Sequence, residues 1–253
     1  MSDPIVVVSV EGGVGRLRLN RPEKRNAINV ALSRALAEGM ARLDDDPDVG
    51  VIVIEGTDGS FCAGADMEEA LASEDQHVIH AAGPDRVTRR VEASEKPVIA
   101  AIDGPAYGAG ALLACACDIR VVSERTRFRF PGAEYGLVVG AVVLPRLVGP
   151  ALAKELIFTS RVVEAEEAVR IGLANRAVPV EDFAGVVDEM ARTIAAASPL
   201  ALRWSKATIN AAVSGADADA LERQADLLLR GGEDHVRRFT IATQRVTGRG
   251  AAR

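Results

Sequence analysis

The sequence predicts an α/β protein whose first part stacks ββα units around a parallel core and whose last part is helical. Two observations carry this prediction. In the first half of the chain, short runs of apolar and β-branched residues alternate with segments of helical periodicity. In the last third, helical patterns follow one another without strands between them. We therefore expect a core over residues 1–195 and a helical region over residues 196–253.

The N-terminal segments predict a β-hairpin followed by a helix. Residues 5–10 and 14–20 read as strands, and a glycine pair between them forms the turn. A helix is then expected up to about Leu43, because its apolar residues recur every three or four positions. Asn29 or Asn26 can cap this helix, since a side-chain oxygen there can accept from a free backbone N–H.

Two later strands are each followed by a loop of small residues. Residues 49–55 lead into Gly59–Met67 (GSFCAGADM), and residues 97–102 lead through Asp103–Pro105 into an apolar helix that starts at Gly108–Gly110. A helix N-terminus lined with glycine presents free backbone N–H groups and the positive end of the helix dipole. Such groups can hold negative charge that develops on a carbonyl oxygen. One N–H from each loop could serve the same oxygen.

The remaining elements follow from the same signals. Strands are expected at 119–122 and 127–130, a loop at 131–137, and helices at 138–148 with a break at Pro145, 150–158, 164–170, 181–197, 199–213, 217–229 and from about 233. Residues 67–93 are the least predictable segment, because they are polar, rich in alanine and interrupted by a Gly-Pro pair, although the basic run 86–90 within them is expected to be a solvated helix face.

Composition restricts the functional class. The net charge of −6, without a dense basic cluster, argues against nucleic-acid binding, and no apolar stretch is long enough to span a membrane. Three cysteines, Cys62, Cys115 and Cys117, are typical of a reduced cytoplasmic protein. His77 and His80 have helical spacing, but no third ligand accompanies them, so we expect no metal site.

Three motifs in order resemble the crotonase superfamily, also called the enoyl-CoA hydratase/isomerase family. They are Asn20–Ala27 (NRPEKRNA), Gly59–Met67 and Ala100–Asp118 (AAIDGPAYGAGALLACACD), and the resemblance covers nearly the whole chain. It implies a crotonase-like fold and an acyl-CoA thioester as substrate, with coenzyme A as part of that substrate and no separate cofactor. It also implies a homo-oligomer, a trimer or hexamer, in which the C-terminal helices pack against neighbouring subunits.

The same resemblance implies site residues. The backbone N–H groups of Ala65 and Ala109 would stabilise a thioester enolate, unless both loops are merely tight turns. The coenzyme A side would be lined by Lys24, Arg25, Ala63, Gly64, Asp66 and Gly108. Lys24 or Arg25 would face phosphates, unless they are simply solvated, and the Ala63 carbonyl would hold the adenine. Asp66 is mostly structural in relatives and receives no role in the chemistry.

The sequence departs from the family at the acid–base positions. Hydratases of the family carry two glutamates, and these registers fall here on Leu112 and Gly132. An acid that some isomerases place further on falls near Gly140, where it is also missing. General acid–base catalysis needs a titratable group within hydrogen-bond reach of the proton. We therefore expect hydration of crotonyl-CoA to be very weak or absent.

Glu134, beside Tyr135, is the remaining carboxylate in this loop. It could carry residual proton transfer, or it could face a subunit contact or pair with Arg127 or Arg129.

Three functions thus stay open. The chain is an acyl-CoA enzyme that uses an enolate, a protein that binds acyl-CoA without turnover, or a member with another enolate reaction such as decarboxylation. A serine hydrolase is excluded because no Gly-x-Ser-x-Gly motif exists.

Overall fold

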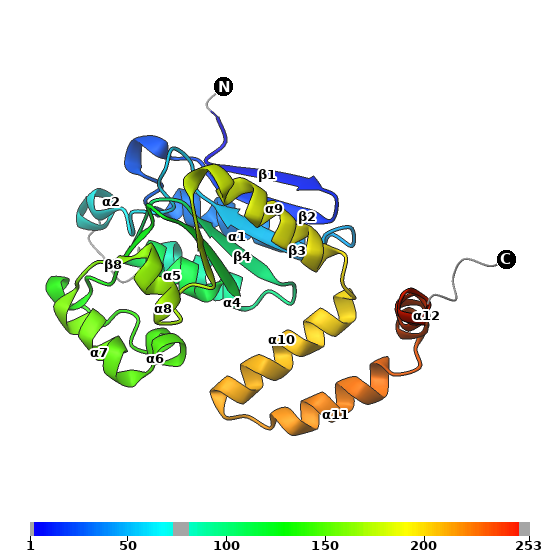
Figure 1. The fold of residues 1–253 in the computed structure, drawn as a ribbon. Helices are drawn as coiled ribbons and strands as arrows, with labels where there is room; N and C mark the ends of the chain where they lie inside the picture. Colours follow the sequence, from blue (N-terminus) through cyan, green and yellow to red (C-terminus); the bar gives the residue numbers. More distant parts are fainter. Residues whose placement is uncertain (1–2, 73–80, 248–253) are drawn as a thin grey trace. The chain divides into compact units, whose positions relative to one another are not determined.

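The computed structural model describes residues 3–72 and 81–247, and the chain divides into two compact units, Met1–Ala196 and Ala197–Arg253. The first unit is a mixed α/β structure built on a mainly parallel sheet, and the second consists of helices (Figure 1). The predicted α/β class with a helical C-terminal region is therefore confirmed.

A six-stranded sheet forms the centre of the first unit. In spatial order its strands are β1 (Val6–Glu11), β2 (Val14–Leu19), β3 (Val51–Glu55), β4 (Val98–Ile102), β6 (Ile119–Ser123) and β9 (Arg176–Val178). The β1–β2 hairpin is antiparallel, and the four other pairings are parallel. The first four residues of β3 are fully buried, as expected for a strand covered on both faces.

Helices cover both faces of this sheet. One face packs against α9 (Val180–Ala195), and the other packs against α1 (Val30–Asp45), α4 (Arg86–Glu92) and α5 (Ala109–Ala116) (Figure 1). Alternate residues of β3 divide between the two layers: Val53 joins the cluster under α9, whereas Ile54 joins the larger core with α1. The period of two along the strand thus builds two separate apolar cores.

A second, three-stranded sheet contains β5 (Pro105–Tyr107), β7 (Arg127–Arg129) and β8 (Val163–Glu164). β5 pairs with β7 in parallel, and β7 pairs with β8 antiparallel. Consecutive strands along the chain, β4 then β5 and β6 then β7, therefore enter different sheets. This is the ββα arrangement that the sequence predicts. Helix α5 begins directly after β5, so its N-terminus lies at the end of a strand of the small sheet.

Short elements complete the first unit: η1 (Pro22–Lys24), α2 (Met67–Ala72), η2 (Ala81–Asp85), η3 (Ala133–Tyr135), α6 (Val143–Val148), α7 (Pro150–Thr159) and α8 (Ala165–Arg170). The described part of the second unit consists of α10 (Pro199–Ser214), α11 (Ala218–Leu229) and α12 (Glu233–Thr247). Asn29 rather than Asn26 caps α1, because its side chain accepts from the Leu32 N–H at 2.8 Å.

The helix expected over 138–148 was wrong in its first part. Helix α6 begins only at Val143, and Gly140 before it has a φ of 79°, which a continuous right-handed helix does not allow. Pro145 does not break the helix, because it lies in the first turn, where a backbone N–H has no partner to lose.

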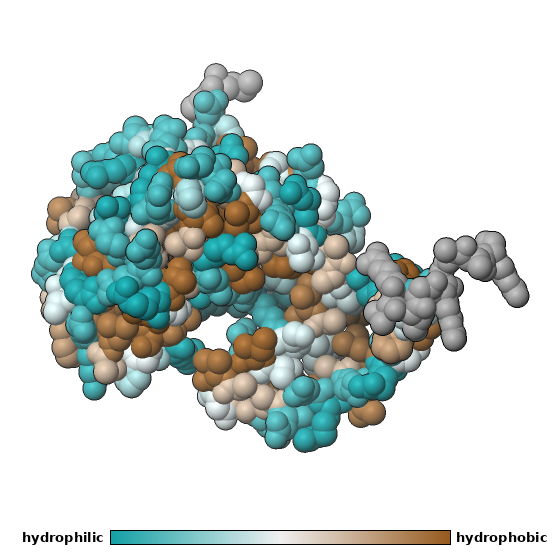
Figure 2. Space-filling view, viewed as in Figure 1, coloured by the Kyte–Doolittle hydropathy of each residue, from teal (hydrophilic) through white to brown (hydrophobic). Residues whose placement is uncertain are grey.

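Helices α10 to α12 expose several large apolar side chains. Leu227 is 82% exposed and Phe239 is 66% exposed, and Figure 2 shows hydrophobic residues at the surface of α10, which carries Ile209 and Val213. A hydrogen bond connects the start of α10 to the start of α12, because Ser198 Oγ donates to Asp234 at 2.5 Å. This bond, together with Arg238 and Arg237, lowers the pKa of Asp234 to about 2.

No helix within 3–72 and 81–247 is both long and apolar enough to cross a membrane. The same residues contain no group of three or more metal-ligating side chains. His77 and His80 lie outside the described residues.

Candidate active site

The loop after β3 is held against β5 by main-chain hydrogen bonds. The Cys62 N–H donates to the Pro105 carbonyl at 3.0 Å, and the Tyr107 N–H donates to the Cys62 carbonyl at 3.0 Å. Cys62 itself is fully buried, which raises the pKa of its thiol to about 12, so it serves as packing and not as a nucleophile. The two small-residue loops are thus joined by main-chain pairing close to Ala65, which is exposed, and Ala109, which is partly buried.

The N-terminus of α5 begins beside this loop. Gly108 has a φ of 49°, and its N–H donates to the Arg129 carbonyl at 2.9 Å, which fixes the helix start to β7. A Cβ on Gly110 would lie 2.3 Å from the Cys62 carbonyl oxygen, so only glycine allows this approach. The helix therefore starts with small residues because its first turn rests on the neighbouring loop.

Ala65 and Ala109 lie on these two adjoining loops. A Cβ on Gly64, the residue before Ala65, would be 3.8 Å from the Ala109 nitrogen and 3.0 Å from the Tyr107 oxygen. Neither the Ala65 N–H nor the Ala109 N–H donates a hydrogen bond to any residue in 3–72 or 81–247. Two free donors on adjoining loops, one at a helix N-terminus, are suited to bind a negatively charged oxygen.

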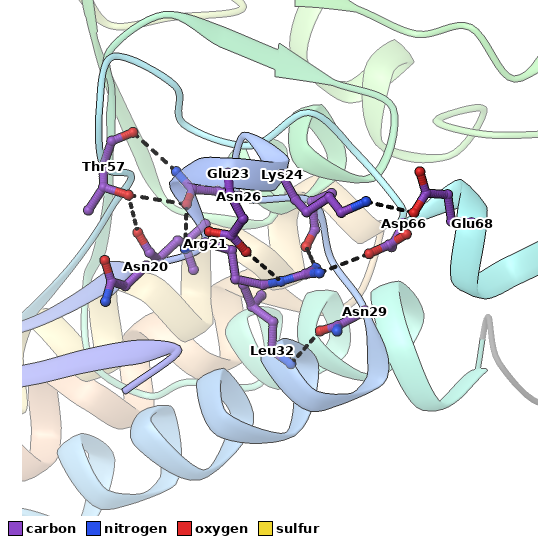
Figure 3. A network of polar contacts seen from close by, with 12 residues as sticks. Asn20, Arg21, Glu23, Lys24, Asn26, Asn29, Leu32, Thr57, Asp66 and Glu68 are labelled. Atoms are coloured by element: carbon purple, nitrogen blue, oxygen red, sulfur yellow. Dashed lines mark hydrogen bonds and ion pairs between the residues drawn. The ribbon is translucent and has the colours of Figure 1, made fainter. Parts of the chain in front are cut away.

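The segment before α1 is shaped by Asn26, which is fully buried and has a left-handed φ of 57°. Its amide oxygen accepts from the Arg21 N–H at 2.9 Å (Figure 3). Its amide nitrogen donates to the Ser60 carbonyl at 2.7 Å. Thr57 also donates to the Asn26 oxygen. Asn26 therefore connects the segment carrying Lys24 to the loop after β3, a role that the sequence did not indicate.

Lys24 and Arg25 differ in their surroundings. The Lys24 ammonium pairs with Glu68 of α2 at 2.6 Å, and this hydrogen bond raises the pKa of Lys24 (Figure 3). Arg25 is exposed, and its carbonyl accepts from the Ala63 N–H at 3.0 Å. The backbone of Arg25 thus lies beside the loop that carries Ala63, and the Lys24–Glu68 pair is exposed to solvent.

Asp66 holds this region together. Its carboxylate accepts from Arg21 Nη2 at 3.0 Å, while the same arginine donates to the Ala27 carbonyl at 2.6 Å (Figure 3). Partial burial acts to raise the pKa of Asp66, but the hydrogen bonds from Arg21 and the Glu69 N–H outweigh it and lower the pKa below its usual value. Asp66 is therefore ionised and engaged in structure.

Leu112 and Gly132, at which the sequence predicts the family's acid positions, carry no titratable group. Leu112 lies on α5, one turn after Ala109, and packs partly against the core. Gly132 is buried, and a Cβ there would be 2.7 Å from the Cβ of Val139. A Cβ on Gly140 would be 3.6 Å from Leu112 Cδ2. Leu112 and the segment 132–140 thus approach one another near the start of α5.

Glu134 follows on the short helix η3. It is 45% exposed and forms an ion pair with Arg129, whose Nε also donates to the Ser160 carbonyl at 2.8 Å. Of the partners that the sequence allowed, the structure has Arg129, while Arg127 pairs with Glu164.

An open hollow of about 540 Å³ lies along α11 in the second unit, lined by Asp219, Glu222, Arg223, Asp226, Leu227 and Arg230. None of these residues belongs to the candidate site. Two of them, Asp226 and Arg230, form an ion pair with each other.

Comparisons with known proteins identify the family of the chain and relatives of its fold. The family model "Enoyl-CoA hydratase/isomerase" matches residues 9–239. The chain is 38% identical over 211 residues to the crotonyl-CoA hydratase of Syntrophomonas wolfei, covering 81% of each protein. It is 36% identical over 211 residues to the short-chain-enoyl-CoA hydratase of Clostridium acetobutylicum, covering 81% of this chain and 80% of that protein. The crystal structure of an enoyl-CoA hydratase from Bacillus anthracis superposes with a TM-score of 0.90 at 29% identity, covering 95% of this chain and 96% of that one.

Proposed function

The chain belongs to the enoyl-CoA hydratase/isomerase family, and we propose that it stabilises the enolate of an acyl-CoA thioester with the N–H groups of Ala65 and Ala109. The observation that carries this proposal is the 3.8 Å approach between the Gly64 Cβ position and the Ala109 nitrogen, with both N–H groups free among the described residues. When an α-proton or an α-substituent leaves the thioester, negative charge moves to the carbonyl oxygen. Two fixed donors aimed at that oxygen lower the barrier without having to reorganise.

Coenzyme A would lie along Lys24, Arg25, Ala63, Gly64, Asp66 and Gly108. Lys24 and Arg25 support this, because the Arg25 carbonyl pairs with the Ala63 N–H and both cations are accessible to solvent and can face phosphate as positive charge. Lys24 would exchange its partner Glu68 for a phosphate oxygen. Asp66 contributes by holding Arg21 and the loop in place rather than by contact with the thioester.

We further propose that hydration is slow. Adding water to the double bond needs a base for the water and an acid for the α-carbon, and the family positions for both carry Leu112 and Gly132. General acid–base groups contribute about 10²–10⁴-fold each, so their loss leaves positioning and the oxyanion contacts. Glu134 is the candidate for residual proton transfer, although its pair with Arg129 favours a structural role.

The apolar acid positions favour one alternative, an acyl-CoA binding protein without turnover. The two functions share the thioester site and differ in chemistry alone. Decarboxylation, which generates the enolate by loss of carbon dioxide, requires less proton transfer and is a third possibility.

Calorimetry with butyryl-CoA and with free coenzyme A, followed by a crotonyl-CoA hydration assay, tests the proposal. We expect heat with the thioester and a hydration rate far below the roughly 10² s⁻¹ of a good enzyme. No heat with any thioester would refute the binding proposal, and fast hydration would refute the assignment of Leu112 and Gly132 to the acid positions.

A further inference from the structure

Val139 occupies the volume that a side chain at position 132 would need. A Cβ on Gly132 would lie 2.7 Å from Val139 Cβ, 2.9 Å from its Cγ2 and 3.0 Å from the Leu137 carbonyl oxygen. Carbon atoms of neighbouring side chains pack at about 3.5–4.0 Å, so these distances leave no room. Glycine at 132 and valine at 139 are therefore a matched pair.

Two leucines lie beside Gly140, the residue that follows Val139. A Cβ on Gly140 would lie 3.2 Å from Leu144 Cδ1 and 3.6 Å from Leu112 Cδ2, so both leucines meet at the residue that follows Val139. Leu144 is fully buried, whereas Leu112 and Val139 are only partly buried. We call Leu112, Val139 and Leu144 the apolar wall.

The apolar wall lies beside the N-terminus of α5. Pro131, next to Gly132, has its Cγ and Cδ 4.0 Å from the Cβ position of Gly108. The Leu112 N–H donates to the Gly108 carbonyl at 3.0 Å, in the first turn of the helix that Ala109 begins. An acyl group whose carbonyl oxygen reaches Ala109 would therefore run along Leu112 and Val139.

We propose that Val139 determines the acyl specificity of this site, so that the wall accepts hydrocarbon acyl groups and rejects those with a carboxylate or hydroxyl on the third carbon. This inference rests on the proposed thioester function. Contact with the wall favours methylene groups by burying apolar surface, while a carboxylate there loses its water and gains no partner. Arg129, at the end of β7 just before this loop, is engaged by Glu134 and the Ser160 carbonyl. The wall thus argues against the decarboxylation of malonyl-type thioesters.

The binding test compares butyryl-CoA with malonyl-CoA and 3-hydroxybutyryl-CoA, which differ on the third carbon, with free coenzyme A as reference. We expect calorimetry to give a Kd for butyryl-CoA about tenfold lower or more than for the two polar thioesters. Val139→Thr, which exchanges a methyl for a hydroxyl at similar size, should shrink that ratio. Val138→Thr is the matched control, because Val138 is 89% exposed, and it should keep the ratio.

A second test measures the pairing of positions 132 and 139 through thermal unfolding. Gly132→Ala should lower Tm by several degrees in the natural background. It should lower Tm by clearly less once Val139→Gly is present, because only the contact of 3.0 Å with the Leu137 carbonyl oxygen then remains. Val139→Ala is not a suitable partner, because the nearest atom to the new methyl is the Val139 Cβ, which alanine retains. By the same reasoning, Leu112→Glu with Gly132→Glu should gain crotonyl-CoA hydration only when Val139→Gly is added.

The outcomes separate the two proposals. If none of the thioesters binds, the proposed function fails, while the unfolding cycle still tests the packing. If the thioesters bind with equal Kd values, or if Val139→Thr leaves the ratio unchanged, the specificity inference is overturned. An equal loss of Tm from Gly132→Ala in both backgrounds would overturn the pairing on which it stands.

Discussion

The carbonyl oxygen of Cys62 accepts a hydrogen bond of 3.0 Å from the N–H of Tyr107. Together with the bond from the Cys62 N–H to Pro105, it joins the loop after β3 to the strand that leads into α5. The separation of Ala65 and Ala109 is therefore set by main-chain pairing, which side-chain motion does not alter. A rigid spacing of this kind is what two donors need in order to serve one oxygen.

We predict that Gly110→Ala destabilises the protein and weakens thioester binding. The new methyl would meet the Cys62 carbonyl oxygen at 2.3 Å, and a backbone atom cannot rotate away. Overpacking of this kind costs about 1–3 kcal/mol or more. Urea unfolding measures the loss, and calorimetry with butyryl-CoA measures the binding.

Gly185→Ala is the matched control for that substitution. Gly185 also lies in a helix, α9, and a Cβ there would meet nothing within 4 Å. The change should stabilise the protein by about 0.5–1 kcal/mol, because alanine favours the helix. Equal effects of the two alanines would show that the contact with Cys62 is unimportant.

Asp66→Asn should make stability less dependent on pH at the acidic end. The folded pKa of Asp66 is lowered from its ordinary value of 3.8, so its contribution is fully present above about pH 4 and is lost as pH falls through the lower folded value. The variant should be less stable than the natural protein at pH 7, and the two should converge at low pH. Urea midpoints from pH 3 to pH 7 test this, and a constant difference across the range would contradict it.

Glu134→Gln separates the two roles of this residue. Its pair with Arg129 is partly exposed, so the free energy of unfolding should fall by no more than about 1 kcal/mol. If Glu134 transfers a proton, any measured turnover of an acyl-CoA should drop by about 10²-fold or more. Unchanged turnover would assign Glu134 to structure alone.

We expect a trimer or hexamer in solution. Leu227, Leu228 and Phe239 of the second unit are each at least 60% exposed in the single chain, and apolar surface of this kind usually lies in an interface. Sedimentation velocity at micromolar concentration measures the assembly, and a monomer there would exclude it. Leu227→Glu should shift the assembly toward smaller species, whereas a substitution of a surface charge such as Arg203→Gln should not.

Elements with a local signal were predicted from the sequence. The N-terminal hairpin follows from its glycine pair, and the starts of α1 and α11 follow from Asn29 and Asp217, whose side chains accept from the first turn. Strands β5, β8 and β9 were missed, because two or three residues show no alternation and are defined only by their pairing partners. Helix α2 was likewise not predicted from its polar, alanine-rich segment, whereas α4 contains the run 86–90 that was expected to be a solvated helix face.

The candidate site was predicted in part for a related reason. The family motifs indicate which loops carry Ala65 and Ala109, and the structure has these loops side by side. The role of Asn26 had no sequence signal, since a buried amide depends on carbonyl groups that arrive from other loops. The close packing of Gly132 on Val139 could not be predicted either, because neither residue type indicates the backbone turn that brings these two positions together.

The left-handed backbone of Gly64 and Gly108 has a consequence for how this protein tolerates substitution. The proposed donors are main-chain N–H groups, which every amino acid except proline supplies, so a mutational scan would find many replacements accepted at Ala65 and Ala109. The neighbouring glycines have φ values of 112° and 49°, and a Cβ added at position 64 would also lie 3.0 Å from the Tyr107 oxygen. Sensitivity should therefore peak one residue before each donor, and proline should be the most damaging replacement at the donors themselves.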